Sequence, residues 1–540
     1  MTEPASPPTG RAPSAVTTAA LLVAGAVVTA GLTAFALRGA ESRSHIAIAL
    51  GLPVVAGVGL LLVIARDRLA RLPMAGLLAA AVIALPALAI IGPVLSLPGF
   101  RQLFAFRVAA ALVGLAGLLW LVLVHRRWRL EAATYVFLFG AWFCWLTVAL
   151  AWAPDPQAGL RYLFLLLGLG AVAVATASAG TSRRRLRYLL LGLAAVLGLS
   201  LLIATAEWTL RVHLPTAAAF YTHRRRPAAF FVNTNDFGTY LALCWPFVLL
   251  LPALRRSAAT ILLIVAGLVA SLAALLFTGS RTSLLAIALE TVVVGAVIAV
   301  RAGRRTRFVV AVLVVVALLG AGLLLVGRGG LHFKKFDITK IASQVRSGQG
   351  SGAVRFDLQV AGLRAAASRL FLGVGPGNAE IVVARQNPTF TVLNLHDWWL
   401  EVFVDGGLPG LLLFVTIYLL LLASMVRVAR YARDALLAYL GAATAIALVG
   451  FSVAIVGPST AITFSPMAIL FGLGLAVLIR ARREVRELQA GLTPTGSHPP
   501  GGPPDLLDSR AHPDGAARTH DAARGPTLSG GDAQPAGGGR

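Results

Sequence analysis

The residues best suited to chemistry are basic side chains that stand beside apolar segments. They occur in His223–Pro227 with the adjoining Phe230–Asp236, in Thr278–Ser283, and in Leu395–Glu401. Each arginine can pair with two phosphate oxygens at once, so two arginines from different segments would hold both phosphorus centres of a diphosphate. Imidazole takes up a proton near neutral pH, which suits His396 to activating a hydroxyl group. These residue types therefore indicate chemistry on a diphosphate.

Each of these groups also has a plainer interpretation. Arg281 lies in a short polar turn where a guanidinium is costly unless it meets an anion, but it could instead extend to lipid headgroups. The triplet Arg224–Arg226 could be an exposed loop on anionic lipid, with one member aimed inward. A lone histidine such as His396 is often structural. Trp398 and Trp399 are either interfacial belt residues or a stacking platform for a sugar ring.

Metal and cofactor sites are not indicated by the sequence. The histidines and carboxylates of the outer segments form no i, i+4 histidine pair, and Cys144 and Cys244 both lie in apolar runs. The glycine-rich stretch Gly373–Gly377 contains Pro376 and has no flanking parallel-strand unit, so it predicts a turn rather than a nucleotide-binding loop. We therefore expect neither a metal nor a cofactor.

The elements that must position these residues are membrane-spanning helices. Of the 540 residues, 58% are hydrophobic and 13% are charged, and the mean hydropathy is +0.81, whereas soluble domains carry about 25% charged residues. Because a crossing takes about 20 apolar residues, the sequence predicts an all-α polytopic bundle of about 12–14 spans. The candidate spans are 16–37, 45–65, 73–95, 104–124, 133–152, 160–178, 188–207, 236–253, 258–277, 282–300, 308–326, 402–425, 436–456 and 462–479.

Arginine placement predicts the orientation of this bundle. Every second loop is basic, from Arg66–Arg71 to Arg480–Arg486, and short basic loops stay cytoplasmic. Both termini are therefore expected inside, in a multi-pass protein of the cytoplasmic (inner) membrane. The net charge of +25, from 47 basic and 22 acidic residues, is mostly this topology signal. It does not indicate nucleic-acid binding.

Two segments are longer than the other loops, 208–235 and 327–397, and both fall on the outer side. In the second, Phe356, Val360, Leu363 and Ala367 recur at helical spacing, which predicts an amphipathic helix on the outer membrane surface. The expected organisation is a cytoplasmic segment, spans 1–11, an extracytoplasmic catalytic loop, spans 12–14 and a disordered cytoplasmic tail. The corresponding boundaries are 1–15, 16–326, 327–401, 402–482 and 483–540.

The order of the motifs resembles that of the O-antigen ligase and polymerase superfamily of bacterial membrane glycosyltransferases. The resemblance covers about Arg226 to Leu413. The matching motifs, in order, are Arg226–Asn235, Thr278–Arg281, Val354–Asp357, Phe371–Asn378, His396–Glu401 and Asp405–Gly410. Each motif is weak alone, and their order around one long outer loop carries the resemblance.

The resemblance implies a metal-independent, inverting transfer of a glycan from a polyprenyl diphosphate to a hydroxyl of a glycan or lipid acceptor. The transfer would take place beside the lipid bilayer, and an envelope assembly complex is a candidate partner. His396 is similar to the family's catalytic base, and Arg281 and Arg226 to its pyrophosphate ligands. Further candidate substrate contacts are Arg225, Asn235, Arg355, Asp397 and Trp398. The family commonly has His-Asn where this chain has His396-Asp397, so the extra carboxylate would either orient His396 or change acceptor contacts.

Three alternatives remain open. A repeat-unit polymerase would use the same glycan donor and differ only in the acceptor. A transporter or flippase for lipid-linked oligosaccharide is favoured by Glu290, which the sequence places inside a span, although most of the conspicuous charges gather on the outer face. The third alternative is a scaffold for an envelope assembly complex, but such a function would assign no role to Arg281 and His396.

Overall fold

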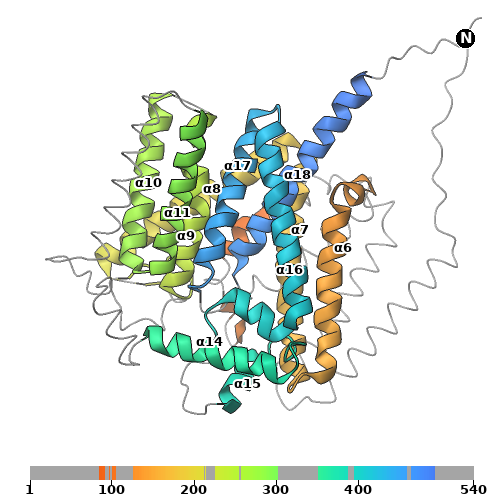
Figure 1. Ribbon diagram of the computed structural model, residues 1–540. Coiled ribbons are helices and arrows are strands. Elements are labelled where there is room, and N and C mark those ends of the chain that lie inside the picture. Colours follow the sequence, from red (N-terminus) through yellow and green to blue (C-terminus); the bar gives the residue numbers. More distant parts are fainter. Residues whose placement is uncertain are drawn as a thin grey trace, which may run out of the picture. The chain divides into compact units, whose positions relative to one another are not determined.

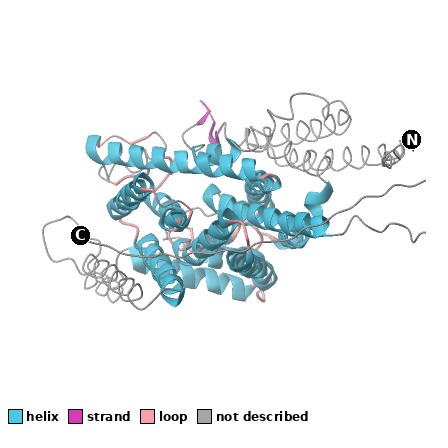
Figure 2. Ribbon diagram, turned by 90° about the horizontal axis from the view of Figure 1, so that it is seen from above, coloured by secondary structure: helices cyan, strands magenta, loops and turns pink. Residues whose placement is uncertain are grey.

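The computed structural model describes ten stretches of the chain. They are 84–91, 96–97, 100–104, 126–211, 213–214, 226–254, 257–301, 351–386, 394–458 and 464–492. Within them the fold is helical apart from one antiparallel hairpin, β1 (Ser96–Leu97) and β2 (Phe100–Phe104), at the edge of the view in Figure 2. The predicted all-α class is confirmed. The chain divides into two compact units, Met1–Leu488 and Gln489–Arg540, and every candidate site residue lies in the first.

The helices labelled in Figure 1 form the bundle and one layer at its end. Their bounds are α6 (Arg126–Val148), α7 (Pro156–Ser178), α8 (Arg183–Leu210), α9 (Thr234–Leu249), α10 (Ala258–Thr278), α11 (Arg281–Arg301), α14 (Ser351–Ser368), α15 (Ala379–Gln386), α16 (Trp398–Tyr431), α17 (Ala435–Ala454) and α18 (Ser465–Leu492). Single 3-10 turns follow three of them, η2 (Ala149–Trp152), η3 (Ala179–Thr181) and η5 (Leu251–Ala253).

Seven helices in the described residues are long and apolar enough to cross a membrane. They coincide with the predicted spans at 133–152, 160–178, 188–207, 258–277, 402–425, 436–456 and 462–479. Helices α9 and α11 fall on two further predicted spans. The predicted spans 16–37, 45–65 and 308–326 lie outside the described residues, as does 104–124 beyond Phe104, and 73–95 is described only over 84–91, which is helical. The total of 12–14 stays a prediction.

Short polar side chains determine where several helices begin. Asp155 caps α7, Asn233 caps α9, Ser257 caps α10, Asp397 caps α16 and Asp434 caps α17, each accepting a backbone N–H of the first turn. The first N–H groups of a helix have no partner within the helix, so such a cap stabilises the end. The apolar runs thus have defined starting points at the edge of the membrane region.

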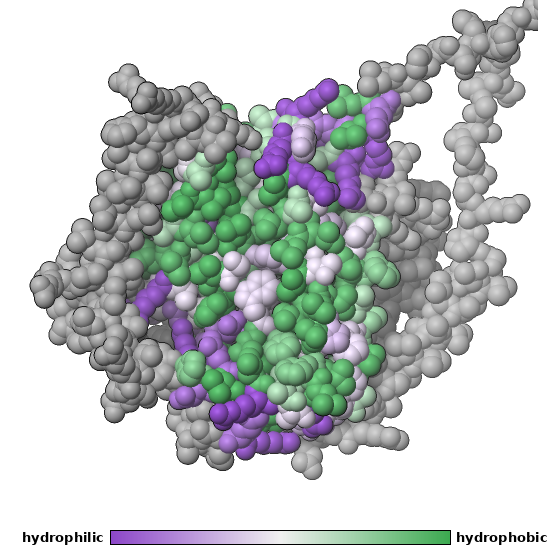
Figure 3. Space-filling view, in the orientation of Figure 1, coloured by the Kyte–Doolittle hydropathy of each residue, from purple (hydrophilic) through white to green (hydrophobic). Residues whose placement is uncertain are grey.

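Helix α17 forms the centre of the packing and contacts α16, α11 and α9. Its Leu440, Leu448 and Phe451 side chains are fully buried. In the view of Figure 3, hydrophobic side chains cover the middle of the molecule and hydrophilic ones gather at its two ends. Large apolar side chains such as Leu202 and Leu262 stay exposed on the bundle. An apolar belt of this kind is stable in lipid rather than in water.

Helix α14 lies across one end of the bundle, next to α15 and α16 (Figure 1). The predicted helix is confirmed, and the predicted apolar stripe lies on the side that faces away from the protein. The face that packs against the protein contains Leu358, Ala361 and Ala365, whereas Phe356 is 65% and Leu363 53% exposed. Small alanine side chains let α14 approach its neighbours closely, so the larger side chains of the predicted stripe point away.

Candidate functional site

Two arginines from different segments meet at the turn between α10 and α11. Gly279 has φ +71, and the Arg226 guanidinium carbon lies 3.8 Å from the position a Cβ at Gly279 would take. Arg281 is the first residue of α11, two residues beyond that glycine. Arg226 is half-buried, and burial lowers its pKa. The chain thus places two positive charges at one turn. A bound anion would offset the free-energy cost of their burial and mutual repulsion.

Arg355 on α14 extends this cluster and connects it to His396. Burial and the nearby Arg281 charge lower the pKa of Arg355. Burial, followed by the charge of Arg355, lowers the pKa of His396, and a hydrogen bond to the Pro458 backbone raises it. Because the lowering effects are larger, His396 is neutral at pH 7. The structure therefore brings together Arg281, Arg355 and His396 from three separate segments.

The backbone of His396 is held in a left-handed conformation, with φ +53. Its N–H donates to Asn394 Oδ1 at 2.8 Å. Proline has no backbone N–H, so the Pro458 carbonyl oxygen accepts the imidazole hydrogen bond. Nδ1 is buried and has no hydrogen-bond partner among the described residues. With Nε2–H directed at Pro458, Nδ1 carries a lone pair and is the ring atom able to take up a proton.

The other predicted contact residues have different surroundings. Asp397 accepts the backbone N–H groups of Trp399 and Leu400, so its carboxylate is engaged in capping α16. Trp398 is 1% exposed and packs edge-on against Phe414, so no face of its ring is open to a sugar. Asn235 is half-buried in the first turn of α9, where its N–H donates to the capping Asn233. Arg225 lies outside the described residues.

Comparison with known families places most of this cluster in one domain. Residues 266–415 match a family model described as O-antigen ligase, and that range contains Arg281, Arg355 and His396. Over this range the chain is similar to the O-antigen ligase family, and we call residues 266–415 the O-antigen ligase domain. The superfamily resemblance seen in the motifs is thereby confirmed, for a multi-pass membrane protein related to glycosyltransferase-like enzymes. No curated protein matches the chain.

Glu207, which precedes the O-antigen ligase domain, is a site-forming residue that sequence reasoning missed. It lies in the last turn of α8 and is 2% exposed. Its Oε2 accepts the backbone N–H groups of Ala228 and Ala229, both at 2.9 Å, and its Oε1 lies 3.3 Å from His213 Nδ1. The carboxylate therefore anchors the chain two residues after Arg226. A lone acidic residue at the end of an apolar run was the only signal available in the sequence.

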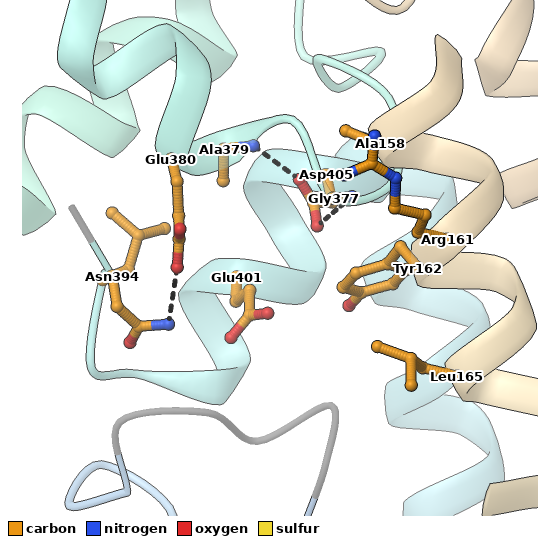
Figure 4. Close-up of a pocket in the computed structure, with 11 residues that line it drawn as sticks. Ala158, Arg161, Tyr162, Leu165, Gly377, Ala379, Glu380, Asn394, Glu401 and Asp405 are labelled. Carbon is orange, nitrogen blue, oxygen red and sulfur yellow. Dashed lines mark hydrogen bonds between the residues drawn. The ribbon is translucent and has the colours of Figure 1, made fainter. Parts of the chain in front are cut away.

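The glycine-rich motif of the O-antigen ligase domain forms a turn, as predicted, and this turn docks on α16. Asp405 accepts the N–H groups of Gly377 and Ala379 at 2.8 and 3.0 Å (Figure 4). A Cβ at Gly373, where φ is +87, would lie 2.5 Å from the Asp405 carbonyl oxygen. Two motifs of the resemblance thus hold each other in place, because only glycine permits so close an approach.

Glu290 lies inside the bundle, as the sequence predicted. It is fully buried on α11, against Gly450 of α17, and neither carboxyl oxygen has a hydrogen-bond partner among the described residues. The cationic cluster of the O-antigen ligase domain does not include this residue. No group of three potential metal-ligating side chains suited to a metal ion occurs in the described part of the chain.

Proposed function

We propose that the protein is a membrane glycosyltransferase of the O-antigen ligase type. It transfers a glycan from a polyprenyl-diphosphate donor, such as undecaprenyl diphosphate, to an acceptor hydroxyl at the outer face of a bacterial cytoplasmic membrane, during assembly of a surface polysaccharide. The observation that carries the proposal is the proximity of Arg281, Arg355 and His396, with Arg226 at the same turn. This group of side chains combines cations that can bind a diphosphate with a neutral imidazole that can accept a proton.

In the proposed reaction the acceptor oxygen attacks the anomeric carbon of the glycan. The bond from that carbon to the diphosphate oxygen breaks, and attack from the opposite side inverts the configuration. His396 Nδ1 takes the proton of the acceptor hydroxyl. Arg281 and Arg226 bind the polyprenyl diphosphate as negative charge develops on it. Because arginines supply the positive charge, the proposed transfer does not depend on a divalent metal.

The proposed topology follows from charge and hydropathy. The short arginine-rich loops face the cytoplasm, as do both termini, and the cluster of Arg226, Arg281 and His396 faces outward. Residues 327–401 form the extracytoplasmic catalytic loop in this arrangement. The glycan donor reaches the cluster from the surrounding bilayer, in which its polyprenyl chain is soluble. A glycan or lipid acceptor approaches from the aqueous side, and envelope assembly proteins are the candidate protein partners.

The direct test is transfer by the purified full-length protein in lipid nanodiscs, with a polyprenyl-diphosphate glycan as the donor. We expect transfer in the presence of a metal chelator, and a loss of about 100-fold or more in His396→Ala. His125→Ala, in a predicted cytoplasmic loop, is the matched control and should retain activity. Full activity in a well-folded His396→Ala protein would overturn the role of His396, and dependence on a divalent metal would overturn the metal-independent mechanism.

Analysis of the surface glycans of a deletion strain distinguishes the acceptors. The length of the polysaccharide chains is measured separately from their attachment to the cell surface. Polymer that is made but not attached indicates a ligase. Short or single repeat units indicate a polymerase, which uses the same glycan donor. Unaltered glycans would contradict both and favour transport of another molecule, for which the buried Glu290 is the residue to vary first.

A further inference from the structure

A separate pocket of about 220 Å³ lies between α7, α15 and the first turns of α16 (Figure 4). Its polar lining residues are Arg161 and Tyr162 from α7, Glu380 from α15, Asn394, and Glu401 and Asp405 from α16. None of these residues belongs to the proposed diphosphate site. Single-ligand pockets for drug-sized molecules measure about 300–1,000 Å³, so this pocket suits one smaller ring.

Two of the lining side chains are largely buried but reach the pocket with their polar atoms. Glu401 is 9% and Tyr162 is 7% exposed, and their polar atoms are not among the fully enclosed ones that lack a partner in the described part of the chain. The Tyr162 hydroxyl interacts electrostatically with Glu401 and Asp405, so the three groups lie near one another without bonding directly. Figure 4 shows the Glu401 carboxylate and the Tyr162 ring on facing sides of the pocket. Buried polar groups are nearly always satisfied, so a ligand with hydroxyl groups between them would complete their bonding.

Hydrogen bonds within the protein orient three other polar side chains of the pocket, those of Asp405, Asn394 and Glu380. Asp405 accepts the N–H groups of Gly377 and Ala379. Asn394 donates to Glu380 Oε1 at 3.2 Å and accepts the backbone N–H of His396. Asn394 therefore connects the pocket wall directly to the residue proposed as base. A molecule bound in the pocket would lie beside the segment that positions His396.

We propose that this pocket binds one neutral or amino-sugar ring of a glycan, with Glu401 and Tyr162 as its principal contacts. Carboxylates accept hydrogen bonds from neighbouring sugar hydroxyls, and the tyrosine hydroxyl both donates and accepts. Three carboxyl groups and one arginine line the pocket, so a sugar acid is disfavoured. The assignment rests on the proposed glycosyl transfer for its biological meaning, but sugar binding can be measured without it.

The test is saturation-transfer NMR on the full-length protein in nanodiscs, with methyl glucoside, glucosamine and glucuronate as probes. We expect the first two to bind and glucuronate not to bind. Glu401→Gln and the conservative Tyr162→Phe should each weaken binding about tenfold, the effect of losing one hydrogen bond to a charged or buried group. Glu487→Gln, in the exposed pair with Arg480 on α18, is the matched control and should bind as the parent protein does.

The outcomes separate this inference from the proposed function. Arg281→Ala should abolish transfer and leave probe binding unchanged. Absence of probe binding to the parent protein, equal binding in both pocket variants, or a preference for glucuronate would each overturn the sugar pocket, whatever the transfer assay shows. With transfer measurable, a raised KM for the acceptor in Tyr162→Phe assigns the ring to the acceptor, and a raised KM for the glycan donor assigns it to the donor. If glycan transfer is absent and the sugar probes bind, sugar binding by the pocket is supported and the proposed reaction is not.

Discussion

The Glu207 carboxylate at the end of α8 holds the backbone N–H of Ala229, 22 residues further along the chain, at 2.9 Å. Ala229 is fully buried and has a left-handed backbone with φ +48. A non-glycine residue keeps this conformation only where its surroundings hold it. The same carboxylate accepts the N–H of Ala228. Glu207 therefore anchors the chain that follows Arg226, whose guanidinium lies at the turn before α11.

The first prediction concerns Glu207. Glu207→Ala leaves two buried N–H groups unsatisfied, at about 1–3 kcal/mol each, so we expect a lower melting temperature and a KM for the glycan donor raised about tenfold or more. Glu207→Gln keeps an accepting oxygen and should restore much of that KM. A KM unchanged in a folded Glu207→Ala protein, with only its stability lowered, would show that Glu207 is purely structural.

The second prediction concerns pH. Burial and Arg355 lower the pKa of His396 below its ordinary value of 6.5. A base must be unprotonated, so kcat/KM should fall as the pH drops through this lowered pKa and stay level from pH 7 upward. Arg355→Gln removes a nearby positive charge, which raises the pKa of His396 and moves the acid limb to higher pH. A pH–rate profile of both proteins measures this shift, and an identical acid limb in the two would contradict the coupling.

The third prediction separates charge from geometry at Arg281. Arg281→Ala should lower kcat/KM about 100-fold or more, because a cation is lost where negative charge develops. Arg281→Lys keeps the charge but not the planar fork, so it should recover only part of the activity. Arg364→Ala, an exposed arginine on α14, is the control for general loss of positive charge. Equal activity in Arg281→Lys and the parent protein would show that a point charge is sufficient.

The fourth prediction concerns the turn docked on α16. Gly373→Ala places a Cβ 2.5 Å from backbone atoms of Asp405 and Gly407 in a left-handed conformation. Backbone strain alone should cost about 1–3 kcal/mol, which thermal unfolding in nanodiscs would detect. Gly140→Ala is the matched control, because a Cβ there meets nothing within 4 Å on α6. It should keep or raise stability by about 0.5–1 kcal/mol. Equal melting temperatures for the two variants would contradict the docking.

The sequence alone determined the class of the protein and proposed most residues of its candidate site. Apolar runs of about 20 residues must be helices, since lipid cannot satisfy an open backbone. Nine predicted spans coincide with α6–α11 and α16–α18. Arg226, Arg281, Arg355 and His396 were identified from residue type and motif order. They stand out in the sequence because cations in an apolar setting need a partner.

Only the tertiary structure decided which polar residues do what. Asp397 and His396 are neighbours in the chain, yet one caps α16 while the other presents a free Nδ1 near Arg355. Trp398 and Glu401 share one helix turn, but Trp398 is enclosed by the core and Glu401 lines a pocket. Glu207 and Asp405 act on N–H groups more than twenty residues away. Such partners depend on how the helices pack. The rotation of a helix about its own axis decides which neighbour each of its side chains faces, and no local pattern of residues records that rotation.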